Sequence, residues 1–196
     1  MKNKSDLIFN AAFKLFLKCG YNNTSMDEVA KEAGVSKQTI YNNFENKQII
    51  LQKIVINQSK KYYKDIEDVE VTEENFDILL EKFCKNFLKL VIDEKLCAVH
   101  RIVLSEMATN PNITKNFYNI GPSITYIMLE KFISKAAAKG LIQVSSPSKY
   151  ADHLISLLKG KYYNEILFGV RDNVSKEELE EHLKSVLTIL NNSKNK

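Results

Sequence analysis

Six polar side chains crowd one seven-residue segment of this chain, residues 37–43: Lys37, Gln38, Thr39, Tyr41, Asn42 and Asn43. They offer hydrogen-bond donors, acceptors and one positive charge, and the segment contains no acidic residue. Side chains of this kind on one face of a helix can read base edges and grip phosphates. We expect Lys37 to contact guanine, Gln38 to contact adenine, and the methyl group of Thr39 to contact thymine.

Phosphate contacts are expected around these base contacts. Tyr41 and Asn42 lie one helical turn further on. Thr24 or Ser25 and Lys47 stand at predicted helix N-termini, where backbone N–H groups and the helix dipole favour a phosphate. The alternative for each residue taken singly is a solvated polar side chain.

Two short helices must position these residues. Ser25 and Glu28 have the spacing of a capping box, and Gly34 can end the first helix in a left-handed conformation. Ser36 caps the second helix, whose apolar residues Ile40 and Phe44 are four apart. Residues 24–47 therefore predict a helix-turn-helix.

The same segment resembles the DNA-binding domain of the tetracycline-repressor (TetR) family. The resemblance rests on a capped helix with an apolar-Ala pair, an Ala-Gly-Val-Ser turn, an aliphatic-Tyr pair, a Phe and a Lys, here Val29-Ala30, residues 33–36, Ile40-Tyr41, Phe44 and Lys47. It implies phosphate contacts at the matching positions of the helix N-termini and the recognition helix. A second stretch, 100–169, resembles one branch of the family's C-terminal domains through residues 104–106, Phe117-Tyr118, Gly121-Pro122, Gly140-Leu141 and Gly160.

Helical periodicity continues through the rest of the chain, and no stretch alternates with period two. We predict an all-α fold of about nine helices, at roughly 4–19, 25–34, 36–44, 46–66, 72–91, 95–109, 113–139, 147–168 and 175–190. Gly121-Pro122 must kink or split the seventh. Residues 1–47 would form a three-helix DNA-binding domain, and residues 48–196 a domain for ligand binding and dimerisation.

The eighth and ninth predicted helices carry more apolar surface than a helical hairpin can bury. Gly160, inside the eighth, would permit the close approach of another helix. We expect the pair to form a four-helix bundle with a second copy of the chain; the alternative is that it closes the core of a monomer. The family resemblance implies the homodimer, whose two recognition helices would read a near-palindromic site on double-stranded DNA.

An effector would act on the second domain. Candidate ligand-contacting residues are mostly aromatic and suit a largely apolar small molecule: Phe83, Phe87, Met107, Phe117, Tyr118, Tyr126 and Tyr162. The alternative is that most of them belong to an ordinary core.

Charge and composition favour the same reading. Residues 1–61 hold ten Lys against five Asp and Glu, whereas residues 62–196 hold 18 Lys and Arg against 19 Asp and Glu. The positive excess lies with the helix-turn-helix, as phosphate binding requires. The alternative is a basic face that only aids solubility.

Nothing in the sequence predicts an enzyme, a metal site or a cofactor. His100, His153 and His182 are isolated from one another and from any nucleophile motif, and the three Cys lack metal-ligand spacing. No apolar run could span a membrane, and the unpaired Cys suit a reduced cytoplasmic setting. The sequence predicts a homodimeric repressor released from DNA by a small molecule. The alternatives are a DNA-binding regulator without a ligand and a helical carrier or enzyme.

Overall fold

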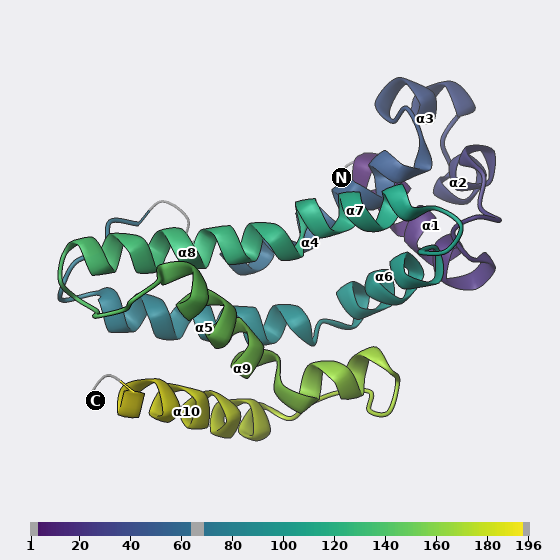
Figure 1. The fold of residues 1–196 in the computed structure, drawn as a ribbon. Helices are drawn as coiled ribbons and strands as arrows, with labels where there is room; N and C mark the ends of the chain where they lie inside the picture. Colours follow the sequence, from purple (N-terminus) through teal and green to yellow (C-terminus); the bar gives the residue numbers. More distant parts are fainter. Residues whose placement is uncertain (1–3, 64–68, 194–196) are drawn as a thin grey trace. The chain divides into compact units, whose positions relative to one another are not determined.

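The computed structural model describes residues 4–63 and 69–193, and these residues form ten α-helices and no β-strand (Figure 1). In chain order the helices are α1 (Lys4–Cys19), α2 (Met26–Ala33), α3 (Lys37–Asn43), α4 (Lys47–Tyr63), α5 (Phe76–Val91), α6 (Glu94–Ser105), α7 (Pro111–Ile120), α8 (Pro122–Ala138), α9 (Pro147–Leu167) and α10 (Lys176–Ser193). The predicted all-α fold is confirmed.

The split predicted for the seventh helix is confirmed, and one helix begins later than expected; both have local causes. Gly121, with φ −121° and ψ −92°, leaves the helical conformation and Pro122 follows it, so the seventh predicted helix is split into α7 and α8. Helix α5 begins at Phe76 rather than near Thr72, because the Asn75 side chain accepts a hydrogen bond from the Thr72 N–H and holds residues 72–75 in a turn. The expected residues 64–66 of the fourth helix lie outside the described ranges.

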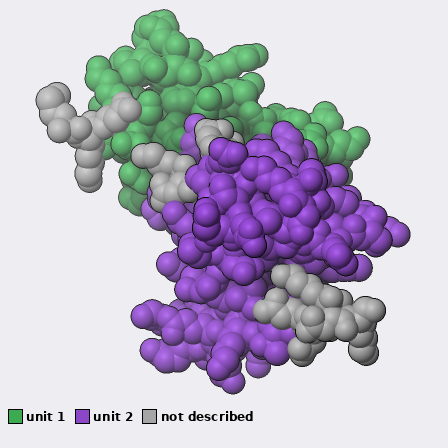
Figure 2. Space-filling model, turned by 90° about the vertical axis from the view of Figure 1, so that its left-hand side faces the viewer, with its two compact units in different colours: residues 1–58, 98–121 green, residues 59–97, 122–196 purple. Residues whose placement is uncertain are grey.

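The chain divides into two compact units, coloured separately in Figure 2. Unit 1 comprises residues 1–58 and 98–121, and unit 2 comprises residues 59–97 and 122–196. The chain therefore enters unit 1 twice. The expected division of roles at residue 47 concerns function and stays a prediction.

Each unit has its own apolar core. In unit 1 the fully buried side chains come from α1 to α4, α6 and α7, and include Ile8, Phe16, Val29, Ile40, Ile50 and Ile113. In unit 2, α9 packs against α5, α8 and α10 (Figure 1). The core there includes Phe83, Leu129, Ile133, Leu154, Ile155 and Leu158. Within the described residues, no helix is long and apolar enough to cross a membrane.

Helix α9 is broken at Gly160, which lies inside the helix predicted over residues 147–168. Its φ of 48° and ψ of −151° lie in a region that only glycine adopts readily, and the helix bends there (Figure 1). The ring of His182, on α10, fills the space that a side chain would need: a Cβ at residue 160 would lie 2.8 Å from its Cε1. The Nε2 of the same ring is 2.9 Å from the carbonyl oxygen of Leu158. The close approach expected at Gly160 is thus made by a side chain of α10.

Candidate nucleic-acid interface

The first helix of the motif, α2, is capped at both ends as predicted. The Ser25 hydroxyl accepts from the Glu28 N–H at 3.2 Å, and the Glu28 carboxylate accepts from the Ser25 N–H at 2.8 Å. The hydrogen bonds that the Glu28 carboxylate accepts from the Ser25 N–H and from the Ser25 hydroxyl lower the pKa of Glu28. Gly34 ends the helix at φ 68°, and the Val35 N–H donates to the Ala30 carbonyl. The turn is therefore set by local hydrogen bonds.

Helix α3 has one buried face and one exposed polar face. The Ser36 hydroxyl caps it by accepting from the Thr39 N–H at 3.1 Å, and Ile40 is fully buried. Lys37, Gln38, Tyr41 and Asn42 are exposed, with Tyr41 51% accessible, and Thr39 is half-buried. The structure thus brings the five predicted DNA-contacting residues of this helix together on one accessible surface.

In the protein alone, these polar side chains bind one another. Lys37 forms an ion pair with Asp27 of α2, which raises the pKa of Lys37. Gln38 donates to the Asn42 side chain at 2.7 Å, and the Ser36 and Thr39 hydroxyls are 2.8 Å apart. Asp27 was missed by the sequence reasoning, which assigned no acidic residue to this surface. Contact with DNA would exchange these internal hydrogen bonds for intermolecular ones.

The Lys37–Asp27 pair leads to a prediction about affinity. We expect Asp27→Asn to tighten binding to operator DNA about two- to fivefold, the usual range for an exposed ion pair, because it frees Lys37 and removes a negative charge. A fluorescence-anisotropy titration measures the change. Glu32→Gln is the matched control, since Glu32 lies on the same helix and pairs with Lys14. Equal effects of the two substitutions would show that only net charge matters.

The ammonium group of the half-buried Lys47 is held by backbone carbonyls. It donates to the backbone carbonyls of Tyr21, Asn22 and Thr24 at 2.6, 3.0 and 2.9 Å, and it lies 4.5 Å from the centre of the Tyr21 ring. Burial lowers the pKa of Lys47, whereas the carboxylates of Glu106 and Glu28 oppose this shift. Burial and the charge of Glu106 raise the pKa of Tyr21 to about 12. The first residue of α4 therefore fixes the turn that precedes α2.

Thr24 and Ser25 also have internal partners. Thr24 is 2% exposed and its hydroxyl donates to the Gly20 carbonyl at 2.8 Å, whereas the exposed Ser25 is part of the capping box. The phosphate contacts expected of Thr24, Ser25 and Lys47 stay predictions.

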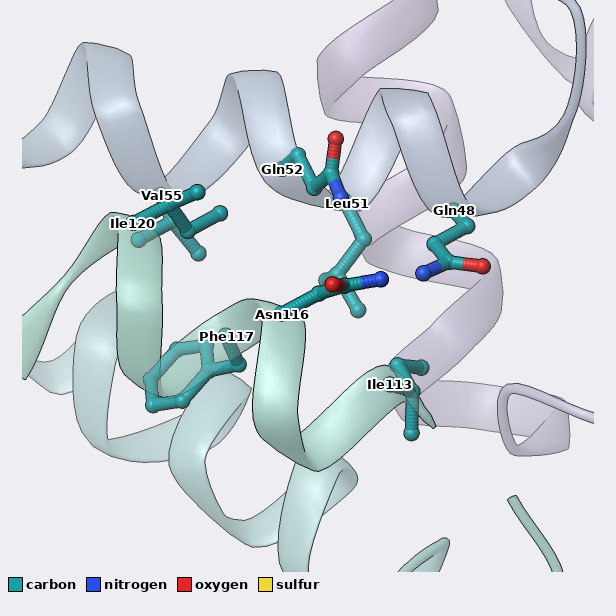
Figure 3. A pocket seen from close by; sticks show the side chains of 8 residues that line it. All are labelled: Gln48, Leu51, Gln52, Val55, Ile113, Asn116, Phe117 and Ile120. Atoms are coloured by element: carbon teal, nitrogen blue, oxygen red, sulfur yellow. The ribbon is translucent and has the colours of Figure 1, made fainter. Parts of the chain in front are cut away.

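The seven predicted ligand-contacting residues fall in both units. Phe83 and Phe87 are buried and stacked on each other in unit 2, which also holds the half-buried Tyr126 and Tyr162. Met107 and Tyr118, in unit 1, are 60% and 55% exposed. Phe117 lines a small hollow between α4 and α7 (Figure 3), together with Gln48, Leu51, Gln52, Val55, Ile113, Asn116 and Ile120. The ligand-contacting role of the seven stays a prediction.

Two further observations concern possible metal ligands and the cysteine thiols of the described residues. They contain no group of three or more His, Cys, Asp and Glu side chains that could hold a metal ion. Cys84 and Cys97 are buried, and burial raises the pKa of the Cys84 thiol to about 12.

An all-helical fold with a capped helix-turn-helix near its N-terminus is typical of DNA-binding transcriptional regulators, and comparison with known families agrees. Residues 8–54 match the family of bacterial regulatory proteins named tetR. Residues 79–191, more than half of the chain, match the C-terminal domain of AefR-like transcriptional repressors. The chain belongs to the TetR family.

Several known proteins are similar to this chain over nearly its whole length. An uncharacterised helix-turn-helix regulator of Bacillus subtilis, YvkB, is 26% identical over 190 residues, which cover 93% of this chain and 94% of YvkB. The structure of the flavonoid-responsive regulator FrrA is similar with a TM-score of 0.76 and 29% identity, covering 95% of this chain and 94% of FrrA. The fatty acid degradation regulator FadR of Bacillus halodurans shares the fold, with a TM-score of 0.66, 21% identity and coverage of 97% and 95%.

Proposed function

We propose that this TetR-family regulator is a homodimeric, cytoplasmic repressor that a small, mostly apolar molecule releases from its operator. The observation that carries the proposal is the exposed polar face of α3, held on a helix whose other face is buried. Lys37, Gln38 and Thr39 would contact bases, and Tyr41 and Asn42 would contact phosphates. The excess of lysine in residues 1–61 supports binding to a polyanion.

Dimerisation through α9 and α10 would present two copies of α3 to a near-palindromic site. Large apolar side chains exposed at these helices support this interface: Phe168 and Val170, just beyond α9, are each 78% exposed, and Ile189 of α10 is 50% exposed. Burial of such side chains against a second copy would stabilise a dimer.

Release would follow from a difference in affinity between two states. An effector that binds more tightly to the form with unsuitable spacing of the recognition helices would deplete the DNA-binding form. The similarity to FrrA, a regulator whose name describes it as flavonoid-responsive, supports a small-molecule effector.

A gel-shift titration tests the proposal. The purified protein is titrated against its own upstream DNA and against a scrambled fragment, at several salt concentrations. We expect selective binding that weakens steeply with salt. Binding equal on both fragments would overturn the proposed function.

Gln38→Ala tests the base contact in the same titration. We expect a loss of affinity for the upstream DNA of about 10- to 100-fold, the range for one bidentate base contact, with little change on scrambled DNA. Gln143→Ala, an exposed glutamine in unit 2, is the control and should leave both affinities unchanged. Equal weakening on both fragments by Gln38→Ala would show a phosphate contact instead.

A further inference from the structure

The ammonium group of Lys159 lies between two tyrosine rings in unit 2. It is 5.3 Å from the ring centre of Tyr163, also on α9, and 6.0 Å from that of Tyr126 on α8. The side chain is half-buried. Both rings pack against the apolar core of this unit, which includes Leu129 and Leu158. A positive charge is therefore held at the edge of an aromatic and aliphatic environment.

Lys159 has no carboxylate partner among residues 4–63 and 69–193. Burial is the cause that lowers its pKa, and no neighbouring charge opposes the shift. Two other cations that face aromatic rings, Lys47 and Arg171, have polar partners. Lys47 has three carbonyl acceptors, and Arg171, 5.5 Å from the ring centre of Tyr162, pairs with Glu178 and Glu165. Because Lys159 has no carboxylate partner in the described part of the chain, a bound anion would supply one and gain a charge-assisted hydrogen bond.

The position of Lys159 in α9 connects this charge to the rest of unit 2. The next residue, Gly160, is the one at which the helix breaks, and the His182 ring of α10 occupies the break. A ligand that binds Lys159 would therefore act next to the bend of α9, where α9 contacts His182 of α10. Both helices belong to the proposed dimer interface.

We propose that Lys159 is the anion-binding group of the effector site, and that the effector is a lipophilic carboxylate. The carboxylate would accept hydrogen bonds from the ammonium group, while its apolar body lies against the rings of Tyr126 and Tyr163. This inference rests on the proposed response to an effector and narrows its chemical class.

Isothermal titration calorimetry of the full-length protein without DNA tests this site. The probes are decanoate, 2-naphthoate and decanol, the last being a neutral molecule with the chain length of decanoate. We expect at least one carboxylate to bind, and decanoate to bind more tightly than decanol. Lys159→Met should raise the Kd of the bound carboxylate roughly tenfold or more, the size of a lost charged hydrogen bond, and Lys159→Arg should largely preserve it.

Lys161→Met is the matched control, since Lys161 is exposed and lies 5.4 Å from the ring centre of Tyr162. It should leave carboxylate binding unchanged. Three results would each overturn the proposal: neither carboxylate binds at 1 mM or below (roughly −4 kcal/mol), decanol binds as tightly as decanoate, or Lys159→Met binds as the wild type does. Thermal melting of Lys159→Met confirms that the variant is folded.

The proposed DNA binding and the proposed carboxylate site can be rejected independently of each other. Calorimetry needs no operator, so carboxylate binding that depends on Lys159 would stand even if the gel shift found no selective DNA binding. Conversely, selective DNA binding by a protein that binds neither carboxylate would leave the regulator in place and reject this effector class.

Discussion

Replacing Lys47 with Met is expected to lower the free energy of unfolding by about 2–4 kcal/mol and to weaken operator binding about tenfold. The substitution removes hydrogen bonds to a charged donor, which are worth about 1.5–3 kcal/mol each. The total loss is smaller than their sum because water can hydrogen-bond to the freed carbonyls. The carbonyls of Tyr21, Asn22 and Thr24 share this one donor group. Without it, the turn before α2 loses its connection to α4. Denaturant unfolding and fluorescence anisotropy measure the two effects.

The salt dependence of DNA binding separates this internal role from a phosphate contact. A lysine that neutralises a phosphate contributes about 0.9 to the slope of log K against log salt. We expect Lys47→Met to leave the slope unchanged, because the ammonium donors already have protein acceptors. A slope reduced by about 0.9, with normal stability, would instead establish the phosphate contact that the resemblance implies.

Two further variants sharpen the result. Lys47→Arg keeps the charge, but its planar guanidinium cannot place three donors on the same converging carbonyls. It should therefore also destabilise the protein. Lys53→Met, on the exposed side of α4, should change stability by less than about 0.5 kcal/mol.

Gly160→Ala should have an effect of similar size in unit 2, lowering the free energy of unfolding by about 2–4 kcal/mol. The backbone conformation alone costs a residue with a Cβ about 1–3 kcal/mol. The added methyl group would also lie 2.8 Å from Cε1 of His182, which is closer than real Cβ contacts. Thermal or denaturant unfolding measures the loss.

Gly169→Ala is the control for backbone strain without a clash. Gly169 has a φ of 70° and nothing within 4 Å of the position of an added Cβ, so we expect a cost of about 1 kcal/mol. Adding His182→Ala to Gly160→Ala should recover part of the stability, because the pair is in direct contact. If Gly160→Ala were neutral or stabilising, α9 would have to run through residue 160 as a regular helix in solution.

The helix-turn-helix could be predicted because the residues that begin and end its helices lie close together in the sequence. Ser25 and Glu28 are three residues apart, and Gly34 and Ser36 act on the helix ends beside them. Such hydrogen bonds form within one turn of chain, so residue types and spacing suffice to identify them. The exposed face of α3 followed in the same way from the burial of Ile40 and Phe44.

The partners of those exposed residues were not predictable in the same way. Lys37 pairs with Asp27 ten residues away and on another helix, which depends on how α2 and α3 pack. The prediction of the ligand residues rests on their aromatic or otherwise apolar character, and that property does not distinguish Phe83 in a core from Tyr118 on a surface.

The sequence by itself determined an all-helical chain and the caps of its DNA-binding motif, because each depends on periodicity or on residues a few positions apart, and the motif carried the resemblance to the TetR family. Only the tertiary structure decided that Lys47 holds the turn at residues 21–24, that His182 fills the break at Gly160, and that Lys159 lies between two tyrosine rings. These contacts join different helices. Their geometry is set by how apolar faces pack, and no local pattern in the chain records it.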